Sequence, residues 1–159
     1  MADVMSPEQR SMCMARIKGR NTGPEILLRQ ALWAANLRYR LHSKLPGRPD
    51  VVFSRYRLAV FVDGCFWHGC KEHGVMPKGN GLFWKKKLGG NVDRDGRVNQ
   101  ELRNLGWRVF RVWEHDVERD TVGVVSKIVA RLQSTHRSPT RSSVEPRHRN
   151  DSIAGRDHP

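Results

Sequence analysis

The segment from Asp63 to His73, D-G-C-F-W-H-G-C-K-E-H, holds the densest group of chemically reactive side chains in the sequence. It contains two of the three cysteines and two of the seven histidines of the chain. Thiolate and imidazole groups at such short spacing are the ligands that a tetrahedral zinc ion prefers. With one histidine further along the chain, five residues compete for four ligand positions: Cys65, His68, Cys70, His73 and His115. One histidine is therefore expected to serve another purpose. The alternative is that both cysteines are free, buried thiols.

A second group of reactive side chains is acidic, in a chain that is otherwise basic. Asp50 follows the turn sequence L-P-G-R-P, and Asp63 follows the apolar segment 58–62. If the two short segments pair as an antiparallel hairpin, both carboxylates reach the same edge of the sheet. Two carboxylates there would bind a hard divalent cation, which polarises a phosphodiester and activates water. Each aspartate also suits a turn. Glu25 fits the capping box that begins at Thr22, which is a sufficient reason for its presence.

Two aromatic pairs lie close to these groups. Phe66-Trp67 is inside the Cys/His segment, and Phe83-Trp84 directly precedes Lys85, Lys86 and Lys87. Aromatic side chains beside cations suit stacking on bases or wedging between them, and the lysines suit contact with phosphates. The alternatives are that one member of each pair belongs to the core and that the lysines form a solvated helix face. Trp107 and Trp113 are assigned to the core.

The composition points to a polyanionic partner. The chain has 159 residues and a formal net charge of +13 at pH 7. Residues 133–159 carry five arginines and three acids, so most of the surplus lies in the remaining part. Residues 1–132 are predicted to form a single domain, and 133–159, rich in Ser, Pro and Arg, a disordered basic tail. No apolar run approaches the roughly 20 residues that span a bilayer, and no signal peptide is recognisable, so a cytoplasmic protein is expected.

The elements that must position these residues follow from periodicity and from helix-capping signals. Helices are predicted over 6–17, 22–36, 82–105 and 121–132, and strands over 38–41, 50–53, 58–62 and 107–113. The apolar segment 58–62 is expected to be the central strand. In the second helix one buried face is expected, formed by Ile26, Leu27, Leu28, Ala31, Leu32 and Ala35. Cys13 is interpreted as a small hydrophobic residue of the first helix. This order predicts a small α/β layer with a mixed sheet.

The blocks P-G-R-P-D (46–50) and D-G-C-F-W-H-G-C (63–70), in this order and spacing, resemble the very-short-patch repair (Vsr) endonuclease family. The resemblance continues through N-V-D-R-D (91–95), G-W-R-V (106–109) and V-W-E-H (112–115), and covers roughly residues 5–130. It implies a restriction-endonuclease-like fold of the PD-(D/E)xK type, a mixed sheet flanked by helices, with a structural zinc. It also implies an enzyme that nicks duplex DNA 5′ to the thymine of a T:G mismatch, the lesion left by deamination of 5-methylcytosine.

The resemblance further implies roles for individual residues. Asp50 and the backbone carbonyl of Val62 would hold Mg²⁺, and His68 would act on the attacking water with Glu25 and Asp63 in support. The zinc ligands would be Cys65, Cys70, His73 and His115. Phe66, Trp67 and Trp84 would enter the duplex at the mismatch, beside Lys85, Lys86 and Lys87. The expected partner is double-stranded DNA with a T:G mismatch, bound by a monomer, with repair-pathway proteins as further partners and no membrane association.

Two positions depart from the family pattern. Val62 stands where nucleases of this fold carry an acid, with no lysine following, and Gly96 stands where the family tends to have a basic residue. Two other functions remain open. One is a restriction-type or strand-specific nuclease acting on unmodified DNA, and the other is a zinc-stabilised DNA-binding protein without catalysis.

Overall fold

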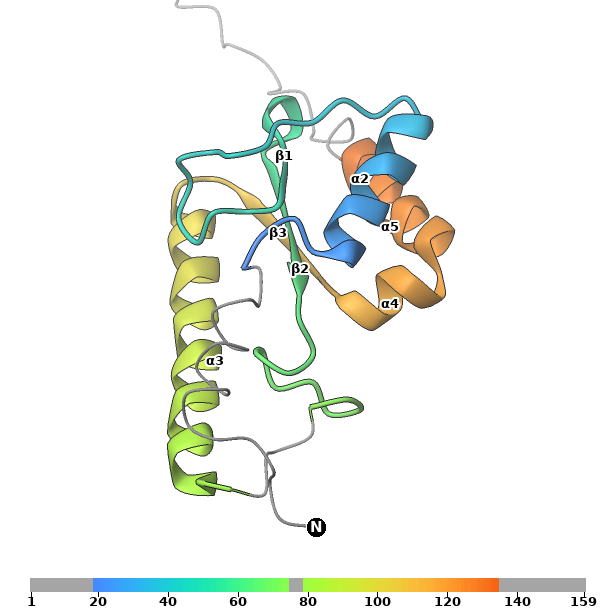
Figure 1. The fold of residues 1–159 in the computed structure, drawn as a ribbon. Helices are drawn as coiled ribbons and strands as arrows, with labels where there is room; N and C mark the ends of the chain where they lie inside the picture. Colours follow the sequence, from blue (N-terminus) through green and yellow to red (C-terminus); the bar gives the residue numbers. More distant parts are fainter. Residues whose placement is uncertain (1–18, 75–78, 135–159) are drawn as a thin grey trace, which may run out of the picture.

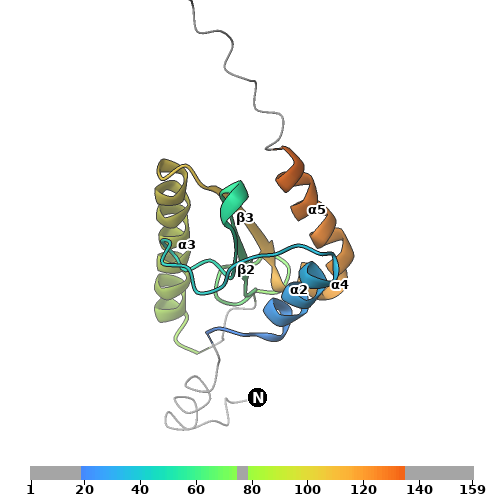
Figure 2. The same ribbon diagram turned by 90° about the horizontal axis from the view of Figure 1, so that it is seen from above.

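The computed structural model describes residues 19–74 and 79–134. Its elements are α2 (Gly23–Ala34), β1 (Val51–Phe53), the 3-10 helix η1 (Ser54–Tyr56), β2 (Leu58–Asp63), α3 (Gly81–Asn104), β3 (Arg108–Trp113), α4 (Glu114–Arg119) and α5 (Thr121–Gln133). A small sheet separates α3 on one face from α2, α4 and α5 on the other (Figures 1 and 2). The expected helix over 6–17, Cys13 and nearly all of the expected tail lie outside the described residues.

The sheet is mixed, as predicted, and its three strands have the order β1-β2-β3. β1 and β2 are antiparallel, with Val51 opposite Val60. β2 and β3 are parallel, and their register ends with Asp63 opposite Trp113. β2 is therefore the central strand. This register also decides which loop residues meet beyond the end of the sheet.

The predicted strand over 38–41 is wrong. Only Arg40 pairs with the sheet, through an isolated bridge to Val52. The left-handed backbone of Asn36 (φ 61°) and His42 (φ 53°) turns the chain on both sides of this bridge. The two turns bend the segment away from the sheet on either side of Arg40, so no continuous ladder forms. Tyr39 instead donates a hydrogen bond to the carbonyl of Arg29 in α2.

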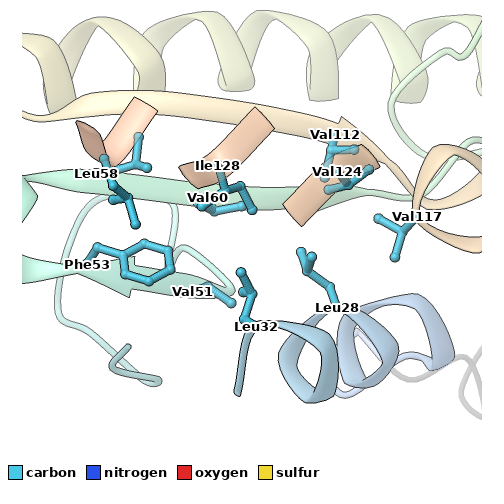
Figure 3. Packing of buried hydrophobic residues seen from close by; sticks show 11 residues of the cluster. Leu28, Leu32, Val51, Phe53, Leu58, Val60, Val112, Val117, Val124 and Ile128 are labelled. Carbon is cyan, nitrogen blue, oxygen red and sulfur yellow. The ribbon is translucent and has the colours of Figure 1, made fainter. Parts of the chain in front are cut away.

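The main core fills the space between the sheet and the layer of α2, α4 and α5 (Figure 3). Alternate residues of β2 serve the two faces, as a strand requires. Leu58 and Val60 enter this main core, whereas Ala59 and Phe61 pack with Leu102 of α3. Since Asp63 continues the second series, its side chain is directed to the α3 side of the sheet.

The predicted buried face of α2 is only partly correct. Leu28 and Leu32 are fully buried, but Ile26 and Leu27 are 42% and 38% exposed. Each residue turns a helix by about 100°, so Ile26 lies about 200° from Leu28 and points away from the sheet. The buried apolar side of α2 is therefore a narrow stripe of residues four positions apart, Leu28 and Leu32.

Three details of the C-terminal half also differ from prediction or refine it. The short helix α4 (Glu114–Arg119) was not predicted, and it directs Val117 into the core. Trp113 is half-buried and stacks on His115 with a centroid distance of 6.4 Å, so it belongs to the Cys/His region rather than to the core. Trp107 packs against the α3-side cluster, as expected.

Within the described residues, no helix is both long and apolar enough to span a membrane.

Gly47 fixes the turn that leads into Asp50, and we expect Gly47→Ala to destabilise the fold. Its φ is +71°, and an added Cβ would lie 2.4 Å from Cγ1 of Val98. The strain and the overlap should lower the free energy of unfolding by about 1–3 kcal/mol, measured by urea denaturation. Gly89→Ala, at an open helical position, is the control and should be neutral or slightly stabilising. A Gly47→Ala protein as stable as the wild type would contradict this account of the turn.

Candidate active site

Three adjoining hollows lie along the edge of the sheet where β2 ends. The carboxylate hollow has a volume of about 520 Å³ and is lined by Asp50, Asp63, Asp95, His68 and Arg111, among others. The aromatic hollow, about 510 Å³, is lined by Phe66, Trp67, Lys87 and Asn91, and shares Glu25, Val62 and His68 with the first. The basic hollow, about 380 Å³, shares Arg20, Arg48 and Asp50 with the first. The carboxylate hollow is thus the middle of a continuous groove.

Asp50 is placed in this groove by the hairpin of β1 and β2. Its backbone N–H donates to Val60, and its Oδ2 accepts a hydrogen bond from the N–H of Val62 at 2.8 Å. Burial, together with the nearby carboxylates of Glu25 and Asp63, raises the pKa of Asp50 to about 6, against the hydrogen bond from Val62 and the charge of Arg29. A partly buried carboxylate beside two other acids is a strong site for a cation.

Glu25, in the first turn of α2, lines the same hollow and is 5% exposed. Its Oε2 accepts hydrogen bonds from the backbone of Asn21 at 2.8 Å and from Arg29 at 3.1 Å. The side chain of Thr22 makes no capping bond. The predicted capping box is therefore wrong, because Glu25 binds the N–H of Asn21 and not that of the N-cap residue Thr22. Glu25 instead lines both the carboxylate and the aromatic hollows.

His68 belongs to a charged network built on β2, β3 and α3. Its Nδ1 lies 2.5 Å from Oδ2 of Asp95 and 3.8 Å from Oδ1 of Asp63. Arg111 binds both carboxylates, at 2.7 Å to Asp63 and 3.2 Å to Asp95, and also donates to Asn99. Burial raises the pKa of Asp63, and the positive charge of Arg111 opposes this shift.

This network contains two residues that the sequence reasoning missed, Asp95 and Arg111. The run D-R-D of α3 was noted without a role for Asp95, and Arg111 had no signal beyond its place on an alternating strand. Because Asp63 is engaged by Arg111, its carboxylate is held in the network beside His68. The structure therefore brings Asp50, Glu25, Asp63 and His68 together in one hollow.

The Cys/His cluster forms just beyond the same edge of the sheet. Asp63 and Trp113 are paired at the ends of β2 and β3, and Cys65 and His115 lie two residues after them along the chain. As a result, Sγ of Cys65 lies 2.9 Å from Nδ1 of His115. The turns of the loop add two more ligands, with Cys70 donating its backbone N–H to Cys65. The ligand atoms of Cys65, Cys70, His73 and His115 all lie within 4.8 Å of one another.

Two thiols and two imidazoles this close fit one tetrahedral metal ion of the zinc type. Burial raises the pKa of the Cys65 thiol to about 11, so its ionisation at neutral pH requires a cation beside it. The side chain of Glu114 accepts the N–H of Cys65 at 2.8 Å and supports the loop. The imidazole of His68, the fifth candidate ligand, contacts Asp95 and is not part of this group of ligand atoms.

The aromatic residues form one group beside the carboxylate hollow. The ring centroid of Phe66 lies 4.9 Å from that of Trp67 and 5.4 Å from that of Trp84. Trp84 is only 7% exposed, a core position, whereas Phe66 and Trp67 are half-buried and line the aromatic hollow. Nζ of Lys87 lies 5.4 Å from the Trp67 ring. Lys85 and Lys86 are exposed on α3.

Comparison with known proteins agrees with this arrangement. A family described as DNA mismatch endonuclease Vsr matches residues 2–73. The type II nicking enzyme V.NaeI of Lentzea aerocolonigenes is 44% identical over 130 residues, which cover 78% of each chain. The type II nicking enzyme V.HpaIIP of Haemophilus parainfluenzae is 45% identical, over 72% of this chain and 84% of its own. The DNA mismatch endonuclease Vsr of Escherichia coli (strain K12) is 44% identical, over 72% of this chain and 74% of its own.

These matches confirm the resemblance drawn from the P-G-R-P-D and G-C-F-W-H-G-C blocks. They also exclude the reading of the chain as a DNA-binding protein without catalysis, since the relatives are named as enzymes that cut DNA. With several relatives above 40% identity across most of both chains, this protein belongs to the Vsr family of DNA mismatch endonucleases and is a DNA endonuclease.

Proposed function

We propose that this protein nicks one strand of duplex DNA 5′ to the thymine of a T:G mispair, as required for very-short-patch repair. The observation that carries the proposal is that the aromatic hollow and the carboxylate hollow share Glu25, Val62 and His68. A base step opened by the aromatic side chains would lie directly beside the groups able to hydrolyse the adjoining phosphodiester. The names of the relatives, mismatch endonuclease and nicking enzyme, support the same conclusion.

The donor groups in the carboxylate hollow fit a magnesium ion, which binds carboxylate and carbonyl oxygens. Asp50 and the backbone carbonyl of Val62 would hold it, with Glu25 lining the same hollow. Such an ion polarises the phosphate and stabilises the leaving oxyanion. Asp50 is already orientated for this task, because the N–H of Val62 fixes its Oδ2 and no described residue bonds its other oxygen.

His68 is the base in this proposal. Its Nδ1 is held by Asp95, so Nε2 is the nitrogen left to accept a proton from the attacking water. Arg111 holds Asp95 and Asp63 in place, and these contacts fix the plane of the imidazole ring. Asp63 therefore acts as a positioning residue.

Mismatch selection is assigned to Phe66 and Trp67, with Trp84 as their buried support. Wedging between base pairs costs a few kcal/mol, and the cost is smallest where pairing is already imperfect. The T:G step is thus preferred with little reading of base edges. Lys87, beside the same rings, would contact a phosphate, and Lys85 and Lys86 would add to the attraction.

The remaining parts of the proposal concern the whole chain. The three-stranded mixed sheet with helices on both faces is compatible with a restriction-endonuclease-like core. Residues 1–132 would form the one endonuclease domain, acting as a monomer, and 133–159 a disordered basic tail. Zinc at the Cys65, Cys70, His73 and His115 cluster would be structural, since all four ligand positions are occupied by protein side chains.

We expect Asp95→Asn to slow nicking about 10- to 100-fold at saturating DNA, because it removes the carboxylate that orientates His68. Asp93→Asn, an exposed position in the same helix, is the matched control. Single-turnover rates and DNA affinity measured for both variants would separate a loss in the chemical step from a loss in binding. Equal rates for the two variants would contradict the role of Asp95.

The direct test of the proposed function uses a duplex with one T:G mispair and a different dye on each strand. With magnesium, we expect only the thymine strand to be cut, at the bond 5′ to the mispaired thymine. Cutting of both strands, or cutting elsewhere, would favour a restriction-type nuclease on unmodified DNA. Tight binding without any cutting would overturn the catalytic assignment of Asp50 and His68.

A further inference from the structure

The basic hollow next to Asp50 is not used by the chemistry described so far. It lies between the start of α2 and the loop that leads into β1, and its wall includes Arg20, Arg29, Ser43, Lys44 and Arg48. Its volume, about 380 Å³, is sufficient for a phosphate group with its adjoining sugar atoms. It is the end of the groove that lies opposite the aromatic hollow.

Among the described residues, most of the positive charge in this hollow has no ion-pair partner. Arg29 is paired with Glu25 at 3.1 Å. In contrast, no carboxylate among the described residues forms an ion pair with Arg20, Lys44 or Arg48. Several cations gathered around one concave surface repel one another, and an anionic ligand would relieve this repulsion.

Two buried polar atoms of the same wall also lack a partner. Within the described part of the chain, Oγ of Ser43 and Nε of Arg29 are buried without a hydrogen bond. A buried polar group left unsatisfied costs about 1–3 kcal/mol. Both groups can donate a hydrogen bond, so an acceptor such as a phosphate oxygen would satisfy them.

The backbone of the loop is held in an unusual conformation here. His42 and Arg48 have positive φ angles of 53° and 55° although neither is glycine. Left-handed backbone at such residues is uncommon and is concentrated at binding and catalytic sites. Lys44 and Arg48 of this loop both line the hollow.

We propose that the basic hollow binds a backbone phosphate of the strand that is nicked, on the 5′ side of the cut. The side follows from the order of the hollows and rests on the proposed function. If the mispaired thymine, 3′ of the cut, lies at the aromatic hollow and the scissile phosphate lies at Asp50, the strand reaches the basic hollow in the 5′ direction. Arg29, Ser43, Lys44 and Arg48 provide its hydrogen bonds and charge.

The first test replaces single phosphates of the duplex by uncharged methylphosphonates, on either side of the cut. Equilibrium binding to the full-length protein is measured without magnesium, so that no cutting is needed. At one position 5′ of the cut, the substitution should lower the affinity of the wild-type protein for the duplex about tenfold. It should hardly change the affinity of the Lys44→Gln variant, because that variant has already lost the contact. Lys127→Gln, at an exposed position of α5, which lines none of the three hollows, is the control and should behave as the wild type.

The second test uses salt dependence and stability. Lys44→Gln should lower the slope of log K against log salt concentration by about 0.9, the value for one phosphate contact, and Lys127→Gln should leave it unchanged. Ser43→Ala removes a buried hydroxyl that has no described partner, so the variant should be at least as stable to urea as the wild type but bind DNA more weakly. A merely structural serine would show the opposite pattern.

The results distinguish this site from the proposed function. If a methylphosphonate 5′ of the cut weakens DNA binding by the wild type but not by Lys44→Gln, the two are coupled and the phosphate site is supported. This conclusion holds even if T:G duplexes are not preferred for nicking. Coupling only to phosphates 3′ of the cut, or effects of Lys44→Gln no larger than those of Lys127→Gln, would overturn it. A protein that nicks T:G duplexes correctly but shows no such coupling would retain the proposed function and lose the phosphate site.

Discussion

Asp50→Asn should reduce nicking at least about a thousandfold, since metal-assisted polarisation of the phosphate contributes several kcal/mol to the rate. The substitution preserves the size of the side chain and the hydrogen bond from the N–H of Val62, so the groove should keep its shape. DNA binding should be unchanged or tighter, because one negative charge has been removed from a basic groove. Nicking rate and affinity are measured on the same T:G duplex.

The same variant should be more stable than the wild type in the absence of magnesium. Burial raises the pKa of Asp50 from 3.8 to about 6, so the folded state holds a proton that the unfolded chain has already released. The contribution of this carboxyl to stability is present at low pH and is lost as the pH rises from about 4 to about 6. At pH 7, Asp50→Asn should therefore raise the free energy of unfolding by about 1–3 kcal/mol.

Glu118→Gln, an exposed position on α4, is the control for both effects and should change neither. An Asp50→Asn protein that nicks at the wild-type rate would remove Asp50 from the chemistry. A variant that is inactive but also less stable would show that Asp50 supports the fold rather than a cation.

Cys70→Ser should remove the metal from the Cys/His cluster and destabilise the protein by at least about 3 kcal/mol. The four ligand atoms come from the loop after β2 and from the start of α4, so one ion closes the end of the sheet. Loss of this closure should also displace His68, which lies in the same loop, and abolish nicking. Zinc content per chain and the urea midpoint are the two measurements.

Cys13→Ser provides the matched control, because it makes the same chemical change at the third cysteine of the chain. It should retain one zinc per chain and the wild-type midpoint. If Cys70→Ser retained its zinc and its stability, the cluster would not be a structural metal site.

Much of the site follows from local patterns in the sequence. The short turn between two apolar segments was sufficient to predict the hairpin, which brings Asp50 and Asp63 to one hollow. Ligand chemistry was sufficient to collect the five candidates for a metal. Choosing four of them required the resemblance to the family, because spacing along the chain does not show which way His68 points.

What could not be predicted depends on contacts between distant elements. Asp95 and Arg111 are separated from His68 by 27 and 43 positions along the chain, and only the packing of α3 against the sheet brings them together. The segment around Arg40 does not form a strand because left-handed residues on both sides turn it away from the sheet, and the hydrophobic pattern of the sequence does not show such turns. The basic hollow is likewise assembled from α2 and a loop that show no common pattern.

The central claim is that a mispair is selected in the aromatic hollow and cut in the carboxylate hollow beside it. Its most direct test is the ratio of single-turnover nicking rates, at saturating protein with magnesium, for a T:G duplex and the matched C:G duplex. The account predicts that the thymine strand of the T:G duplex is nicked at least about a hundredfold faster, in line with a difference of a few kcal/mol in opening the base step. Equal rates on the two duplexes would leave an endonuclease but contradict selection by the aromatic residues.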